Sequence, residues 1–254
     1  MRIIICLLLF LPSQCWAAFG DILNFGVNNS GGSTNCTATL GGSPTAGSLI
    51  VAVCFAGDDA DVVPQGDLLE AIENPDVVQT DTTALGYRYV QSGDGTTWGF
   101  TQGSSDQIAA IVREFDGGFE TTPLDQTGIT AYATNDTTII ATVDGATSQN
   151  DELAVAGWGY RTLAGQAQTI TFDSVSDSFT NLLEEVDQDG TGAEKAVGTA
   201  IKVLSTIHTP STTGTFSASN SVVFSAGALM ATFKASGGAP APAPIKRRPM
   251  GVFR

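Results

Sequence analysis

Carboxylates are the side chains whose spacing in this sequence could do acid–base chemistry. The densest run is Glu184-Glu185-Val186-Asp187-Gln188-Asp189. Glycoside hydrolysis needs only a pair of carboxyl groups, one as the acid and one as the nucleophile or base. Because alternate residues of a strand point to the same side, Glu185 and Asp187 could enter one cleft. The run also leads into Asp189-Gly190, which is typical of a hairpin turn, so it equally fits a solvated strand end. We therefore expect no catalytic residue and keep a glycan hydrolase as an alternative.

Other catalytic chemistries lack the residues that they need. The chain has a single histidine, His208, which precedes Thr209-Pro210. A hydrolytic triad and most zinc centres depend on histidine or on several cysteines, so both are disfavoured. The sequence also has no G-x-S-x-G elbow and no C-x-x-C pair. We expect a protein that is not an enzyme and that has no organic cofactor.

Calcium is the ion that the acidic loops could bind. Ca²⁺ takes roughly six to eight oxygen ligands, many of them carboxylates on loops. Neither acidic loop has the ligand spacing of an EF-hand. The alternative is that both loops are simply solvated. We expect at most a structural calcium, with candidate ligands Asp58, Asp59 and Asp61 in one loop and Asp187 and Asp189 in another.

Aromatic side chains are the candidates for recognition of a carbohydrate. Flat apolar rings stack on sugar faces while neighbouring polar groups bond the hydroxyls. Tyr87 and Tyr89 share one strand face by alternation, so they are the best candidates for an exposed pair. A tryptophan inside a strand is equally typical of a core. The candidate ligand-binding residues are Tyr87, Tyr89, Trp98 and Tyr132.

The first 17 residues have the pattern of an export signal. Met1 and Arg2 give a positive start, Ile3 to Leu11 form an apolar run, and Ala17-Ala18 offers a small-residue cleavage site. The run is too short to cross a bilayer, which takes about 20 residues. We expect a secreted or cell-surface protein without membrane insertion. An uncleaved segment packed in an assembly, such as a virion, is the alternative.

A single disulfide is expected between the cysteines that follow this segment, Cys36 and Cys54. An even pair in an exported chain favours a bridge, provided that the flanking strands bring the Cα atoms within about 7 Å. The alternative is a pair of buried free thiols.

Residues 237–254 form a linker and a basic tail. Ala239 to Pro244 alternates alanine and proline, which favours an extended spacer. Residues 18–238 hold 6 basic and 26 acidic side chains, so body and tail have opposite charge. The tail could dock on an acidic neighbour, including a second copy in a larger assembly, or remain a solvated end. The candidate docking residues are Lys246, Arg247, Arg248 and Arg254.

Between these ends, short apolar runs alternate with turns, which predicts an all-β fold. Only 15% of the residues are charged and 29 are glycine, and the net charge of −15 disfavours nucleic-acid binding. About ten short antiparallel strands are expected in one sandwich domain, residues 18–236. One helical insertion is predicted at Gln65–Glu73, where Leu68, Leu69 and Ile72 have helical spacing before Pro75. The expected strands include Cys36–Leu40, Ser48–Phe55, Trp98–Gln102, Ile108–Phe115, Leu153–Tyr160 and Val222–Lys234.

The sequence also repeats itself weakly. The run Ala46–Val53 is echoed by Asn150–Ala156, and Ile108–Phe115 is echoed by Ala226–Phe233. The offsets are too long for a solenoid. They suggest two interleaved halves of one sandwich, because the segment after Pro123 is turn-like but not linker-like.

Several of these segments resemble jelly-roll β-sandwich modules of phage virion proteins and secreted bacterial binding proteins. The likeness is carried by Ala46–Val53, Trp98, Phe115-Asp116-Gly117, Pro123-Leu124-Asp125, Asp151–Val155 and Ala231–Lys234. It implies a single jelly-roll or Greek-key sandwich that binds a glycan or a protein surface. A virion decoration or tail-associated protein is the alternative.

Overall fold

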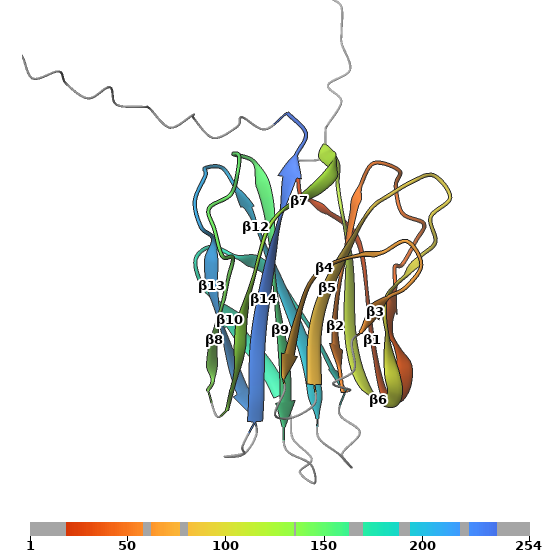
Figure 1. Ribbon diagram of the computed structural model, residues 1–254, viewed down its shortest axis with the longest axis vertical. Helices are drawn as coiled ribbons and strands as arrows, with labels where there is room; N and C mark the ends of the chain where they lie inside the picture. Colours follow the sequence, from red (N-terminus) through yellow and green to blue (C-terminus); the bar gives the residue numbers. More distant parts are fainter. Residues whose placement is uncertain are drawn as a thin grey trace, which may run out of the picture.

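The computed structural model describes residues 19–57, 62–76, 81–134, 136–162, 170–187, 194–218 and 224–237, and every regular element in them is a β-strand (Figure 1). The all-β prediction is therefore confirmed, with antiparallel sheets stacked as in a sandwich. The strands of the first half are β1 (Ile22–Thr39), β2 (Leu49–Ala56), β3 (Val63–Pro64), β4 (Leu69–Asp76), β5 (Asp81–Tyr89) and β6 (Thr97–Phe115). Those of the second half are β7 (Phe119–Thr134), β8 (Thr138–Thr142), β9 (Glu152–Thr162), β10 (Ile170–Val175), β11 (Thr180–Asp187), β12 (Lys195–Leu204), β13 (Ser211–Ala218) and β14 (Phe224–Ala235).

The two halves of the chain build sheets with the same strand order. The first half forms the order β1-β6-β2-β5-β4, with β3 beside the beginning of β6. The second half forms β7-β14-β9-β12-β11 and, as an outer layer, β8-β13-β10. Each of the long strands β1 and β6 takes the place of two shorter strands of the second half. The interpretation of the repeat as interleaved halves was wrong, because each sheet draws on one consecutive half only.

The register of the strands matches the internal sequence repeat. Leu49 of β2 lies opposite Phe115 of β6, and Leu153 of β9 lies opposite Phe233 of β14. All four side chains are fully buried in the same cluster. The repeated residues are therefore those that each half contributes to a common interior.

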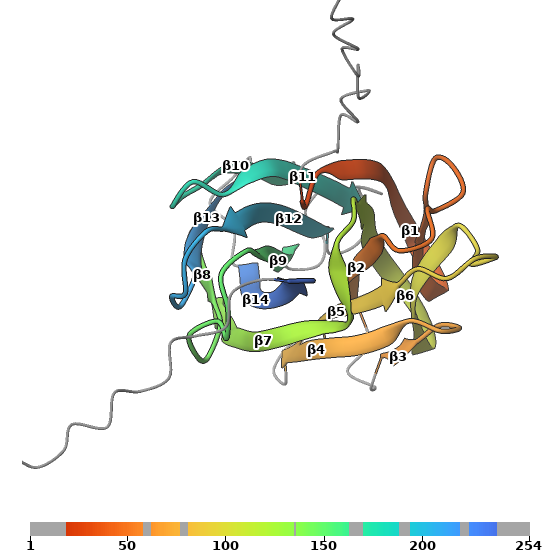
Figure 2. The same cartoon turned by 90° about the horizontal axis from the view of Figure 1, so that it is seen from above.

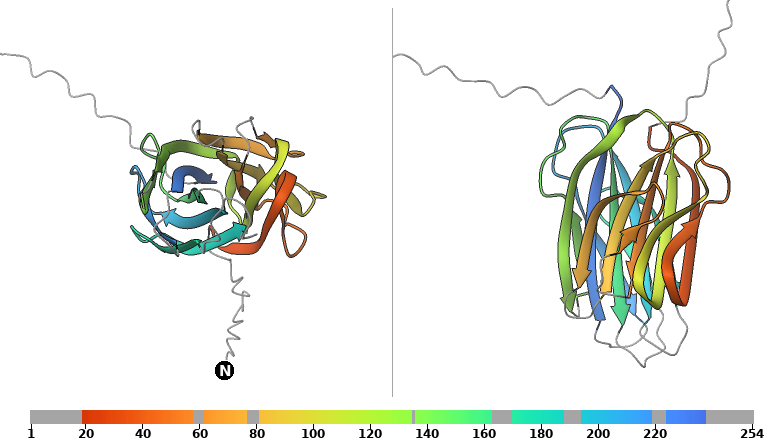
Figure 3. Two further views of the ribbon diagram at one scale, coloured as in Figure 1. Left: turned by 90° about the horizontal axis from the view of Figure 1, so that it is seen from below. Right: turned by 45° about the vertical axis from the view of Figure 1, so that its right-hand side comes forward.

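Three apolar clusters lie between or beside the sheets. One fills the first half and includes Trp98 and Phe100, and another fills the second half and includes Trp158 and Phe216. The third, here called the shared core, lies where the two large sheets face each other (Figure 2). At one side of the shared core β1 lies beside β11, and at the other side β4 lies beside β7. In the view from below, the strands of each half curve around the core of that half (Figure 3).

The helix predicted at Gln65–Glu73 was wrong, because residues 66–67 form a turn and β4 begins at Leu69. A register shift between Glu70 and Ile72 inserts one extra residue into β4. Such a bulge interrupts the strict alternation of a strand. Leu68 consequently faces the first-half core and Ile72 the shared core, while Leu69 is 53% exposed. The three-residue spacing of Leu69 and Ile72, which suggested a helix, comes from this bulge.

The predicted disulfide between Cys36 and Cys54 is confirmed, with Cα atoms 5.9 Å apart. Because β6 lies between β1 and β2 in the sheet, the bridge does not join neighbouring strands. It links Cys36, near the C-terminal end of β1, to Cys54 of β2, and both cysteines belong to the first-half core.

The predicted export signal at residues 1–17 and the tail residues from 238 on lie outside the described residues. Within the described part, no helix is long and apolar enough to cross a membrane.

A group of buried charges closes one end of the shared core. Asp81 begins β5 in the first half, and Lys195 begins β12 in the second. Arg161 Nη1 lies 2.9 Å from Asp81 Oδ2, and Lys195 Nζ lies 3.5 Å from Asp81 Oδ1 and 3.4 Å from Asp106 Oδ2. The first half supplies both carboxylates and the second half both cations. Burial raises the pKa of the Asp81 carboxyl, against the pull of Lys195 and Arg161.

Candidate functional site

The aromatic residues singled out in the sequence lie in different parts of the structure. The Tyr87 ring packs on Phe233, with centroids 5.5 Å apart, and Tyr89 and Tyr132 also pack against the shared core. The Tyr132 hydroxyl is hydrogen-bonded to Thr83 Oγ1. Trp98 belongs instead to the first-half core. The four rings therefore do not form one platform, and Trp98 borders a hollow at the surface.

This hollow, called here the Trp98 hollow, has a volume of about 320 Å³. It lies between the turn before β4 and the turn before β6, so it is formed by loops on a rigid sheet. Trp98 is only 5% exposed, and its Nε1–H donates to the Gly95 carbonyl at 3.0 Å. The lining residues are Gln65, Gly66, Asp67, Gly93, Asp94, Gly95, Thr97 and Trp98.

The charged groups of the Trp98 hollow are held by one arginine. Arg88 Nε donates to Asp94 Oδ2 at 3.0 Å, and its Nη2 lies 3.5 Å from Asp67 Oδ2. The hydrogen bond from Arg88 lowers the pKa of the Asp94 carboxyl, which also accepts the Gln91 N–H at 2.8 Å. Asp94 is thus fixed in the turn, whereas the Asp67 side chain is 73% exposed. Asp67 is the carboxylate that remains accessible to a ligand.

The glycines of the Trp98 hollow keep it open. A Cβ atom at Gly66, Gly93 or Gly95 would meet no atom within 4 Å. Gly66 and Gly93 have positive φ angles of 61° and 95°, which favour glycine, whereas Gly95 has no such constraint. A side chain at position 95 would therefore extend from the border of the hollow into open space without backbone strain.

The acidic residues expected as calcium ligands fall mostly on parts of the chain that the structure does not describe. Asp58, Asp59, Asp61 and Asp189 lie outside the described residues, and of Asp187 only the backbone is placed, at the end of β11. Among the described residues, no cluster of three or more metal-ligating side chains occurs. Glu185, the first carboxylate of the hydrolase alternative, accepts a hydrogen bond from Asn29 Nδ2, which joins β11 to β1.

A pair of hydrogen-bonded carboxyl groups, the buried Glu152 and the half-buried Asp125, lies beside the end of β14. Burial raises the pKa of Glu152 to about 7. Burial would also raise the pKa of Asp125, but hydrogen bonds from the Ser148 hydroxyl and N–H outweigh it and lower that pKa. Glu152 is fully buried, so the pair has a structural role.

This pair makes stability depend on pH. The unfolded chain deprotonates Glu152 near 4.5, but the folded protein only near 7, so the folded state binds the extra proton between these values. We expect the free energy of unfolding to be highest near pH 4.5 and to fall by about 3 kcal/mol as the pH rises from there to 7. Urea unfolding at each pH measures this, and Glu152→Gln should flatten the profile. The exposed control Glu70→Gln should leave it unchanged, and equal profiles for both variants would contradict the assignment.

Sequence reasoning identified Trp98 but missed Asp67, Arg88 and Asp94. Asp94-Gly95 was visible as a turn dipeptide, but Gly66-Asp67 fell inside the predicted helix, and nothing in the sequence says that these two segments meet. No family model, no curated protein and no solved structure matches this chain.

Proposed function

We propose that the protein is a non-enzymatic binding module that holds a glycan in the Trp98 hollow. The observation that carries the proposal is the accessible Asp67 carboxylate beside an indole in a glycine-lined hollow. Carboxylates accept hydrogen bonds from sugar hydroxyls, and an aromatic edge contacts the C–H groups of a sugar ring. The hollow has room for about one monosaccharide unit, since ligand pockets start at roughly 300 Å³.

The lack of a reactive centre in this hollow supports a binding role. Its second carboxylate, Asp94, is engaged with Arg88 and with the turn, and the pKa of Asp94 is lowered. A glycosidase needs one carboxylic acid that is protonated at its working pH. Asp94, whose pKa is lowered, does not supply that acid. A position outside the cell is supported by the Cys36–Cys54 disulfide, because such bridges persist in oxidising compartments.

We also propose that each half of the chain is a jelly roll. The support is the strand order: in the second half, the first, eighth, third and sixth strands lie side by side as β7-β14-β9-β12. The second, seventh and fourth strands form the outer layer β8-β13-β10. This is the order expected of two nested Greek keys for seven of the eight strands, while the fifth strand, β11, pairs with β12 instead of β10. An experimental structure with a different strand order would refute it.

Glycan binding is tested with a variant that adds bulk at the border of the hollow. Gly95→Gln introduces a long side chain at a lining residue, and Gly117→Gln is the matched control, since position 117 is equally open but does not line the hollow. On a glycan array, we expect a bound glycan class for the unmodified protein and for Gly117→Gln. We expect the signal of Gly95→Gln to fall at least about 10-fold, as for the loss of a well-formed contact set.

A second variant separates recognition by Asp67 from simple blocking. Asp67→Asn keeps the shape of the side chain but removes its charge, and we expect about 5- to 30-fold weaker binding in titration calorimetry. If no glycan on the array binds, or if Gly95→Gln binds as the control does, the Trp98 hollow is not a glycan site.

A further inference from the structure

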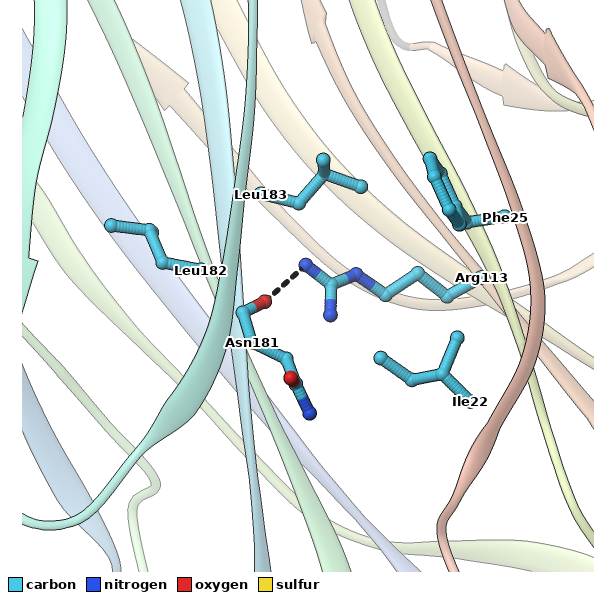
Figure 4. A pocket seen from close by; sticks show the side chains of 6 residues that line it. All are labelled: Ile22, Phe25, Arg113, Asn181, Leu182 and Leu183. Atoms are coloured by element: carbon cyan, nitrogen blue, oxygen red, sulfur yellow. Dashed lines mark hydrogen bonds between the residues drawn. The ribbon is translucent and has the colours of Figure 1, made fainter.

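A second hollow lies at the seam between the two halves, where β1 runs beside β11. It has a volume of about 170 Å³ and is called here the seam pocket. Its apolar lining comes from the edge strands of the two facing sheets, and Phe25 is 54% exposed. Figure 4 shows the Arg113 guanidinium lying among these side chains. The lining residues are Ile22, Phe25, Arg113, Asn181, Leu182 and Leu183.

Within the described part of the chain, Arg113 is a buried cation without a carboxylate partner. Its side chain is only 2% exposed, and its two hydrogen bonds both run from Nη2, to the carbonyls of Asn181 at 2.5 Å and Thr199 at 3.2 Å. Nε is buried without a partner among these residues. Arg88 and Arg161, in contrast, each pair with an aspartate. Burial lowers the pKa of Arg113 to about 10, so the group remains charged at neutral pH.

The fold itself does not require a cation at this position. In the first half Arg113 lies opposite Val51, and in the second half the equivalent residue opposite Val155 is Ala231. The other seam, where β4 lies beside β7, is closed instead by Asn74. Its Nδ2 donates to the carbonyls of Thr130 and Ala228 at 2.9 and 3.0 Å. A neutral amide therefore suffices to join strands across a seam, and the charge of Arg113 is left without a structural reason.

We propose that the seam pocket binds a small monocarboxylate with an apolar body. The carboxylate would supply the acceptor that the Arg113 guanidinium lacks, and the apolar body would pack between Phe25 and Leu183. The size is suitable, since a cavity of about 150 Å³ holds a benzene ring. A charged hydrogen bond inside such a site is stronger than a neutral one. This site is separate from the Trp98 hollow and does not depend on the glycan proposal.

Benzoate is the probe, and benzamide is its neutral counterpart of nearly equal shape. In NMR spectra of the ¹⁵N-labelled full chain, we expect the Arg113 Nε–Hε signal to shift saturably with benzoate, with a Kd below about 1 mM. Benzamide should bind about 10- to 100-fold more weakly, because it lacks the charge. Equal binding of the two probes, or no saturable shift, would overturn the proposal.

Variants test the two parts of the pocket separately. Arg113→Met should abolish the preference for benzoate over benzamide. Because Arg113→Met could impair folding, Phe25→Ala provides a second test at an exposed position and should weaken benzoate binding about 5-fold or more. Its matched control is Leu23→Ala, which lies on the same strand, is 43% exposed and does not line the pocket. If Phe25→Ala binds benzoate as Leu23→Ala does, the ligand does not sit in the seam pocket.

Discussion

Asp81→Ala is expected to lower the free energy of unfolding by about 3–5 kcal/mol, because it leaves a buried charge without its partner. The Asp81 side chain is fully buried and lies between Lys195 and Arg161. Lys195 itself is only 2% exposed, so water cannot replace the lost carboxylate. Lys195 and Arg161 would both lose this carboxylate, and Asp106 would remain 3.4 Å from Lys195 Nζ.

Lys195→Met is expected to cost much less, because Asp81 keeps its contact with Arg161. A methionine fills nearly the same space and leaves no buried cation behind, and the Asp81 carboxylate is not left alone because Arg161 still lies 2.9 Å from it. Urea unfolding of both variants measures the difference. If Lys195→Met destabilises as strongly as Asp81→Ala, the carboxylate is not the residue on which the group depends.

Loss of the disulfide is the second large effect. The bridge closes a loop with a sequence separation of 18 residues, and removing it from a chain of this kind costs about 3 kcal/mol. The double variant Cys36→Ala/Cys54→Ala should therefore unfold at a clearly lower urea concentration than the oxidised protein. The reason is that the unfolded chain gains freedom, while the first-half core keeps most of its contacts.

Reduction of the unmodified protein gives the matched comparison. The reduced protein and the double variant should have the same midpoint of unfolding within the error of the measurement. A variant as stable as the oxidised protein would mean that the end of β1 is held by its pairing with β6 alone.

The strands and the core could be predicted because they depend on local signals. The buried runs of β2 and β9 are apolar and lie between turns, and the internal repeat aligns Leu49 with Leu153 from the order of residues alone. The helix at Gln65–Glu73 failed because a bulge and a helix produce the same short-range spacing. The long strands also escaped prediction, since the segments at Cys36 and Trp98 were expected to be separate strands but are ends of β1 and β6.

The candidate sites were harder to predict, because they depend on contacts between distant segments. Asp67 and Asp94 belong to two separate turns that Arg88 of β5 brings together. Arg113 looks in the sequence like an ordinary polar residue of an apolar strand. Its isolation from carboxylates follows only from the way in which β11 covers β6, and alternation of side chains along one strand carries no information on that contact.

The matching strand order has a consequence for how the molecule can vary. In a symmetric pair of identical subunits, every substitution appears twice, so both junctions must open or close together. Here both partners are parts of one polypeptide, and a residue change on one flank leaves the opposite flank untouched. Asn74 can therefore seal its junction while Arg113 preserves a charged recess at the other, an asymmetry that no true homodimer of either half could maintain.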